Sequence, residues 1–222
     1  MKKSLFLASA LLVALASCKK PTEDAKKETS EPIENEVTTQ ESTSYKINTT
    51  ESVINWKGAK VFVKDYAHTG TLKLKSGELK LASDKSIVDG SFVIDMTTIT
   101  NSDLEDTEKK EMLEAHLKGT AEEKKDHFFN VSEFPEATFE ITGIEGSIVK
   151  GNLTIKGNTN EEEFEATISE ENGQLIAQTS AFKINRVKYK VEYGSKTTFA
   201  DIAKDNVISD DIELEIKLVL EK

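Results

Sequence analysis

The stretch Ile212-Glu213-Leu214-Glu215-Ile216-Lys217-Leu218-Val219-Leu220-Glu221 decides the fold of this chain. Aliphatic side chains occupy every second position, and most of the residues between them are charged. This period of two is typical of a β-strand with one buried and one solvated face. The C-terminus is therefore predicted to be a strand of an antiparallel sheet.

Similar alternation recurs along much of the chain. Turn signals such as Ser76-Gly77, Gly157-Asn158 and Asn172-Gly173 separate the segments that carry it. Many short strands favour a sandwich or a barrel, and a closed antiparallel barrel leaves no exposed sheet edge. We therefore expect an all-β, antiparallel barrel, with further strands at 53–56, 61–64, 72–75, 78–82, 91–95, 137–142, 149–156, 163–168 and 175–184.

One short helix is predicted to interrupt the strands. Asp106 or Thr107 can cap its start, and Gly119 can end it. Its apolar face would carry Leu113, His116 and Leu117, which are spaced at i, i+3 and i+4. A second short helix is expected at 198–204. Four of the ten phenylalanines follow the first helix between residues 128 and 139, so this segment is predicted to plug or line the apolar interior.

The N-terminus is predicted to be a secretory signal at 1–17. Lys2 and Lys3 precede an apolar run that is too short to span a bilayer as a helix. The run ends in Leu15-Ala16-Ser17-Cys18, which resembles the lipobox of bacterial lipoproteins, so Cys18 is expected to be acylated. Cys18 is the single cysteine, so an intrachain disulfide is impossible. We expect a lipoprotein of the bacterial envelope, on the periplasmic face of the outer membrane rather than the cell surface.

Residues 18–44 are predicted to form a disordered tether, and residues 45–222 a single domain. Removing Lys2 and Lys3 with the signal changes the formal charge from −11 to −13. This charge opposes nonspecific binding to nucleic acid or to anionic lipid. Membrane attachment is therefore expected through acylated Cys18, and no nucleic acid is expected as a partner.

The residues give only weak support for catalysis. The three histidines match no zinc spacing, and Gly-x-Ser-x-Gly, Walker and Rossmann patterns are missing from the sequence. Glu161-Glu162-Glu163 and Asp210-Asp211 are interpreted as solvated faces. We expect no enzyme, no metal and no cofactor. An envelope hydrolase stays open as a rival, and it would need His68 or His116 beside a serine or an acid in the cavity.

Arg186 is the only arginine among the 29 basic residues. Its planar guanidinium suits a carboxylate or a phosphate, and it stacks on aromatic rings. Two roles are open. Arg186 could meet an anionic ligand head group beside Tyr189, or it could form an ion pair with Asp210 or Asp211.

The chain resembles the YceI-like family from about Tyr45 to Leu220. The resemblance rests on the order and spacing of several short segments rather than on one motif. Its departure lies after Arg186, where Val187 to Gly194 is longer and more charged than the family's Asp-Phe-Gly. The matching segments are Ser52-Val53-Ile54-Asn55-Trp56, His68-Thr69-Gly70, Val93-Ile94-Asp95, His116-Leu117-Lys118, Phe128-Phe129, Phe134-Pro135, Thr138-Phe139, the stretch 151–157, and Arg186 with Tyr189.

The resemblance implies a secreted, lipocalin-like barrel that binds a long polyisoprenoid: a polyprenol, a prenyl phosphate or a quinone. An eight-stranded barrel can be hollow or filled by its own side chains, so a filled structural or interaction module is the alternative. A homodimer is left open. The residues expected to contact the ligand are Trp56, Phe62, His68, Phe92, Leu113, His116, Leu117, Phe128, Phe129, Phe139, Phe182, Arg186 and Tyr189.

Overall fold

The computed structural model describes residues 41–222. The predicted signal at 1–17, Cys18 and the tether up to residue 40 lie outside the described residues. Within residues 41–222, no helix is both long enough and apolar enough to cross a bilayer.

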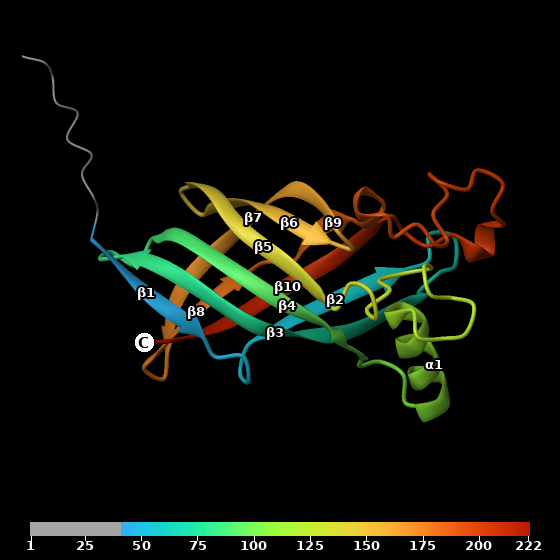
Figure 1. Ribbon diagram of the computed structural model, residues 1–222, viewed down its shortest axis with the longest axis horizontal. Helices are drawn as coiled ribbons and strands as arrows, with labels where there is room; N and C mark the ends of the chain where they lie inside the picture. Colours follow the sequence, from blue (N-terminus) through green and yellow to red (C-terminus); the bar gives the residue numbers. More distant parts are fainter. Residues whose placement is uncertain (1–40) are drawn as a thin grey trace, which may run out of the picture. The chain divides into compact units, whose positions relative to one another are not determined.

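Ten antiparallel strands form a single sheet (Figure 1). Their alternating burial follows the period of two expected from the sequence, most clearly along β7. The strands are β1 Ser42–Ile47, β2 Val53–Ala59, β3 Ala67–Ala82, β4 Ile87–Asn101, β5 Glu136–Glu145, β6 Ile148–Ile155, β7 Asn158–Glu171, β8 Gln174–Thr179, β9 Phe182–Asn185 and β10 Asp211–Glu221.

The sheet closes into a barrel because β10 pairs with both β2 and β8. β1 and β2 share one place in the ring, since both pair with β3 on one side and β10 on the other. β8 and β9 share another place beside β10. The ten strands therefore occupy eight places. The predicted all-β, lipocalin-like barrel is confirmed.

Side-chain hydroxyls bridge the two breaks in the ring beside β10. Ser52, between β1 and β2, accepts a hydrogen bond from the backbone N–H of Val219 at 2.9 Å. Thr179, at the break between β8 and β9, accepts one from the N–H of Ile216 at 3.0 Å. Each hydroxyl satisfies a β10 donor that a continuous neighbouring strand would otherwise bind.

The helix α1 (Thr107–Lys118) has the predicted ends. Asp106 accepts a hydrogen bond from the N–H of Lys109, and Gly119 adopts the left-handed conformation with φ of 70°. The segment after α1 is tied to it, because the N–H of Phe129 donates to the carbonyl of Leu117. Figure 1 shows α1 and the neighbouring loops at one end of the barrel. We call this the open end, and the end beside β1 the closed end.

Four predicted elements differ from the structure. Residues 61–64 form a loop, because the ladder ends at Lys60 and Asp65 reverses the chain at a φ of 55°. Ser76-Gly77 is no turn, since β3 continues through it with a register shift. Residues 175–184 are two strands. The helix expected at 198–204 is a run of turns followed by the 3₁₀ turn η2 (Lys204–Asn206).

Candidate functional site

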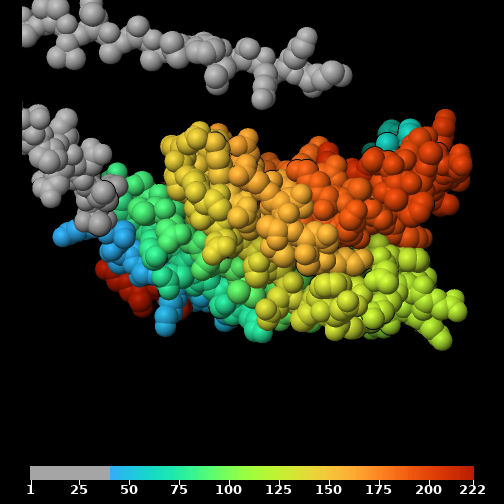
Figure 2. Space-filling model, turned by 45° about the horizontal axis from the view of Figure 1, so that its top comes forward, coloured from blue at the N-terminus to red at the C-terminus, as the bar shows by residue number. Residues whose placement is uncertain are grey.

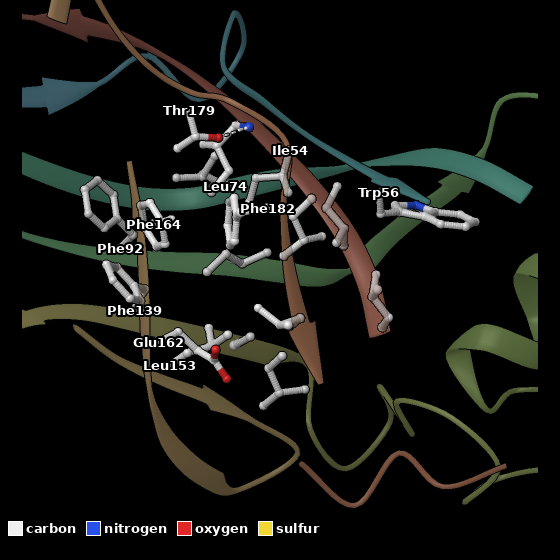
Figure 3. Close-up of a pocket in the computed structure, with 18 of the residues that line it drawn as sticks. Ile54, Trp56, Leu74, Phe92, Phe139, Leu153, Glu162, Phe164, Thr179 and Phe182 are labelled. Atoms are coloured by element: carbon white, nitrogen blue, oxygen red, sulfur yellow. Dashed lines mark hydrogen bonds between the residues drawn. The ribbon is translucent and has the colours of Figure 1, made fainter. Parts of the chain in front are cut away.

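The interior of the barrel holds an apolar cavity of about 200 Å³ (Figure 3). Every strand except β1 contributes to its lining, and it extends from Leu79 toward Gly58 and Ile208 at the open end. Its walls are apolar because the inward positions of the alternating strands are aliphatic or aromatic. Eight of the expected residues line it: Trp56, Phe92, Leu117, Phe128, Phe129, Phe139, Phe182 and Arg186.

A chain of phenylalanine rings crosses the cavity. Phe92 lies 6.4 Å from Phe139 between ring centroids, Phe139 lies 5.3 Å from Phe164, and Phe164 stacks on Phe182 at 4.5 Å. These contacts join β4, β5, β7 and β9. The sequence-based site omitted Phe164, although its alternation with charged neighbours had assigned it to the buried face of β7.

Two of the lining rings rest directly on glycines of neighbouring strands. A Cβ at Gly70 would lie 2.5 Å from the Trp56 ring, and one at Gly151 would lie 2.3 Å from the Phe139 ring. Only glycine allows such close approach. The indole N–H of Trp56 has no hydrogen-bond partner among residues 41–222, so packing alone holds this ring.

Arg186 borders the cavity but its hydrogen bonds go to the protein itself. It begins the 3₁₀ turn η1 (Arg186–Tyr189), and it is 2% exposed. Its guanidinium donates to the carbonyls of Ser209, Val191 and Ile208 at 2.8, 2.6 and 3.3 Å. Asp210 lies 3.8 Å away. Burial lowers the pKa of Arg186, and Asp210 offsets part of that effect. Of the two roles considered, the structure contains the ion pair with Asp210, and the three hydrogen bonds to backbone carbonyls accompany it.

Glu162 differs from its expected place on a solvated face. Its side chain is 11% exposed and lines the cavity, because position 162 is in phase with Phe164 on β7. The Tyr189 hydroxyl donates to its Oε1 at 2.7 Å, and the Lys188 ammonium lies 3.4 Å from the same oxygen. Burial, and then the bond to Glu162, raise the pKa of Tyr189. Both polar groups are thus paired within the protein.

Five expected residues lie outside the cavity lining: Phe62, His68, Leu113, His116 and Tyr189. Phe62 is exposed because residues 61–64 form a loop instead of a strand. Leu113 is half-buried on α1, one turn before Leu117. Tyr189 is fully buried and reaches Glu162 through its hydroxyl, but it does not line the cavity.

His116 packs behind the cavity wall. Its Nε2 lies 2.9 Å from Nδ1 of His127, and its ring meets Phe128 edge to face. Tyr193 stacks on His127 at 4.3 Å between ring centroids. Burial, then the charge of Lys124 and the neighbouring His127, lower the pKa of His116 to about 4. His116 is therefore neutral at pH 7.

His68 ties β3 to the connection before α1. Its Nδ1 lies 2.9 Å from Asp103, which also accepts hydrogen bonds from the Thr69 N–H and from Asn101. Burial pushes the pKa of Asp103 upward, but these hydrogen bonds together outweigh it and lower the pKa. Among residues 41–222, no three metal-binding side chains gather in one place.

Comparisons with known proteins agree with this architecture. The chain is similar to BcnA of Burkholderia cenocepacia, with 21% identity, a TM-score of 0.56, and coverage of 78% of this chain and 98% of that one. It is also similar to a polyisoprenoid-binding domain of Saccharophagus degradans implicated in plant cell wall breakdown, with 17% identity, a TM-score of 0.53, and coverage of 80% and 97%. At these identities the likeness shows the fold.

No curated protein matches the chain. The family model described as YceI-like domain matches residues 45–220, which include all of the barrel except the ends of β1 and β10. The chain therefore belongs to the YceI-like family.

Proposed function

We propose that the barrel sequesters the apolar chain of an isoprenoid-type lipid. The apolar cavity carries this proposal, because moving an apolar chain out of water into such a cavity is favourable. The relatedness to a polyisoprenoid-binding fold supports the choice of ligand class. A polyprenol, a prenyl phosphate and a quinone share this chemistry in their tails. The cavity favours this function over a filled structural barrel.

The size of the cavity limits how a long ligand binds. An apolar cavity of about 150 Å³ holds one benzene molecule, so this one holds on the order of one or two isoprene units. A longer chain needs the rings to move or its remainder to extend through the open end. Trp56 is suited to move, because no hydrogen bond to the described residues fixes it.

The polar groups at the cavity point to a role for the tail rather than the head group. Arg186 and Glu162 are engaged by Ser209, Asp210 and Tyr189. The head group would then remain at the open end. Acylation of Cys18 and an envelope location belong to the same proposal, supported by the lipobox-like sequence at 15–18. Binding and release require no catalysis.

Trp56 offers a direct test, because it is the only tryptophan and it lines the cavity. We expect geraniol, a two-unit prenol, to shift the emission of Trp56, and a long polyprenol to compete with it. Ala137→Phe places a ring in the cavity and should weaken geraniol binding at least tenfold. Val88→Phe, at an exposed position on β4, is the matched control.

Native mass spectrometry of protein purified from cells supplies the second readout. A co-purified isoprenoid lipid is the expected result. Apo protein alone, together with an unchanged Trp56 emission in folded protein, would contradict the proposal.

A further inference from the structure

Two loops at the open end expose apolar and aromatic side chains side by side. The β2–β3 loop and the segment before β10 are joined by a hydrogen bond from the Val61 N–H to the carbonyl of Val207. Figure 2 shows the β2–β3 loop (teal) against the orange-red segment that precedes β10. We call the four side chains the rim patch; they are between 43% and 54% exposed and comprise Val61, Phe62, Tyr66 and Phe199.

Lysines accompany these rings. The ammonium groups of Lys196 and Lys204 lie 5.8 and 5.9 Å from the centroid of Phe62, and that of Lys60 lies 4.7 Å from Tyr66. Within residues 41–222, none of the three ammonium groups lies within 4.0 Å of a carboxylate. These three ammonium groups are therefore available to an anion.

The rim patch adjoins the cavity. Lys60 pairs with Ile208, and both Ile208 and Gly58 line the cavity. A Cβ built at Gly58 would meet nothing within 4 Å, so the space in front of this lining residue is unfilled. An apolar surface with lysines around it therefore borders the mouth of an apolar cavity.

We propose that the rim patch docks on the surface of a bilayer that contains anionic lipid. Exposed aromatic rings enter the interface between head groups and acyl chains, and lysines extend their ammonium groups to lipid phosphates. Charge complementarity favours this partner, since lysines outnumber acids in these two loops although the chain as a whole carries a charge of −11; the lysines are Lys60, Lys64, Lys196 and Lys204, against Asp65, Asp201 and Asp205. Docking turns the mouth of the cavity toward the lipid.

Docking of the rim patch is independent of the proposed function, but one consequence of docking rests on that function. If the cavity takes an isoprenoid chain, that chain passes between bilayer and barrel at Gly58 without crossing water. Its head group stays at the membrane surface during transfer. This order of events needs no polar binding site inside the barrel.

The test uses the domain from residue 41 to 222, which removes the effect of acylation at Cys18. This segment closes its own ring of strands, and the two similar structures consist almost entirely of the matched domain, with 98% and 97% of their chains covered. The domain is mixed with vesicles of phosphatidylcholine alone, or of phosphatidylcholine and phosphatidylglycerol in equal parts. Co-sedimentation gives the partition coefficient.

We expect the domain to bind the anionic vesicles. The double variant Phe62→Ser/Phe199→Ser should lower the partition coefficient at least tenfold, because each ring loses apolar contact. Three single variants should each lower the partition coefficient on anionic vesicles about fivefold and leave binding to phosphatidylcholine vesicles unchanged: Lys60→Gln, Lys196→Gln and Lys204→Gln. Val88→Ser, which changes an exposed apolar residue away from the rim patch, is the matched control.

Three results would overturn the docking proposal: no binding to either vesicle, equal binding by the double variant, or self-association that the double variant abolishes without any vesicle binding. The last result would assign the rim patch to a second copy of the chain. Geraniol binding, followed through Trp56, separates the two proposals. A response to geraniol in a protein that fails to bind vesicles leaves the proposed function intact.

Discussion

At the closed end, Leu79 and Leu81 are almost completely buried where β1 pairs along β3, whereas at the open end Phe62 and Phe199 are about half exposed. Strand pairing supplies the backbone hydrogen bonds at the closed end. Loops, α1 and the side chains of Arg186 and His116 hold the open end together. Regions with fewer buried apolar contacts open more readily. The barrel thus combines a base held by strand pairing with an end held by loops and side-chain contacts.

Replacing Arg186 by methionine should have the largest effect on this difference. The change leaves the carbonyls of Ser209, Val191 and Ile208 without their donor and Asp210 without its cation. We expect a loss of about 3 to 5 kcal/mol in the free energy of unfolding, measured by urea denaturation. Arg186→Lys keeps the charge but not the three directed hydrogen bonds. Its free energy of unfolding should therefore lie between those of the unchanged protein and of Arg186→Met.

The same pair of variants tests the other role of Arg186. Unchanged stability in Arg186→Met, together with lost binding of a prenyl phosphate, would show that Arg186 serves the ligand rather than the fold.

Acid should loosen the open end through His116. Its pKa is about 4 in the folded protein and about 6.5 in the unfolded chain, so the unfolded chain binds the proton first. The free energy of unfolding should therefore decrease as the pH falls from about 6.5 to about 4, by about 1 to 3 kcal/mol. The titration of His116 by NMR and urea denaturation at each pH check this.

His116→Leu supplies the control, since it should flatten the pH dependence in that window. Asp103 has a lowered pKa and contributes at more acid pH, below its ordinary value of 3.8. A slope that persists in His116→Leu would assign the effect to other groups.

The smallest expected effects come from removing the two hydroxyls that accept hydrogen bonds from β10. Ser52→Ala leaves the Val219 N–H unpaired in a fully buried place, with an expected loss of about 2 kcal/mol. Thr179→Val leaves the Ile216 N–H unpaired in a part-buried place, with an expected loss of about 1 kcal/mol. Thermal or urea unfolding gives both values. Equal losses would mean that the partial exposure of this site does not lower the cost of the unpaired N–H.

Local patterns predicted most of the fold. The alternation at 212–220 identified β10, and Asp106 and Gly119 marked the ends of α1. Asn172-Gly173 forms the expected two-residue hairpin turn, with φ of 50° and 80°. The same reasoning was wrong for residues 61–64, because a short apolar run can also form an exposed surface loop.

The lining of the cavity was only partly predictable. Aromatic content indicated Phe92, Phe128 and Phe139, and the phase of the β7 alternation contained the information for Phe164 and Glu162. The partners of Arg186 are backbone carbonyls that lie from 5 to 23 residues away. No side-chain pattern encodes such carbonyls, so the engagement of Arg186 required the structure.

The Phe139 ring of the cavity lining packs directly against the main chain at Gly151. A methyl group at residue 151 would lie 2.3 Å from the Phe139 ring and 2.6 Å from the carbonyl oxygen of Glu140, so both the ring and the backbone would have to shift. Whichever way the ring turns, the space beside Phe92 and Phe164 changes with it. The absence of a side chain at residue 151 therefore fixes where the Phe139 ring stands in the cavity lining, and any larger residue there would disturb the ring and the β5–β6 pairing together.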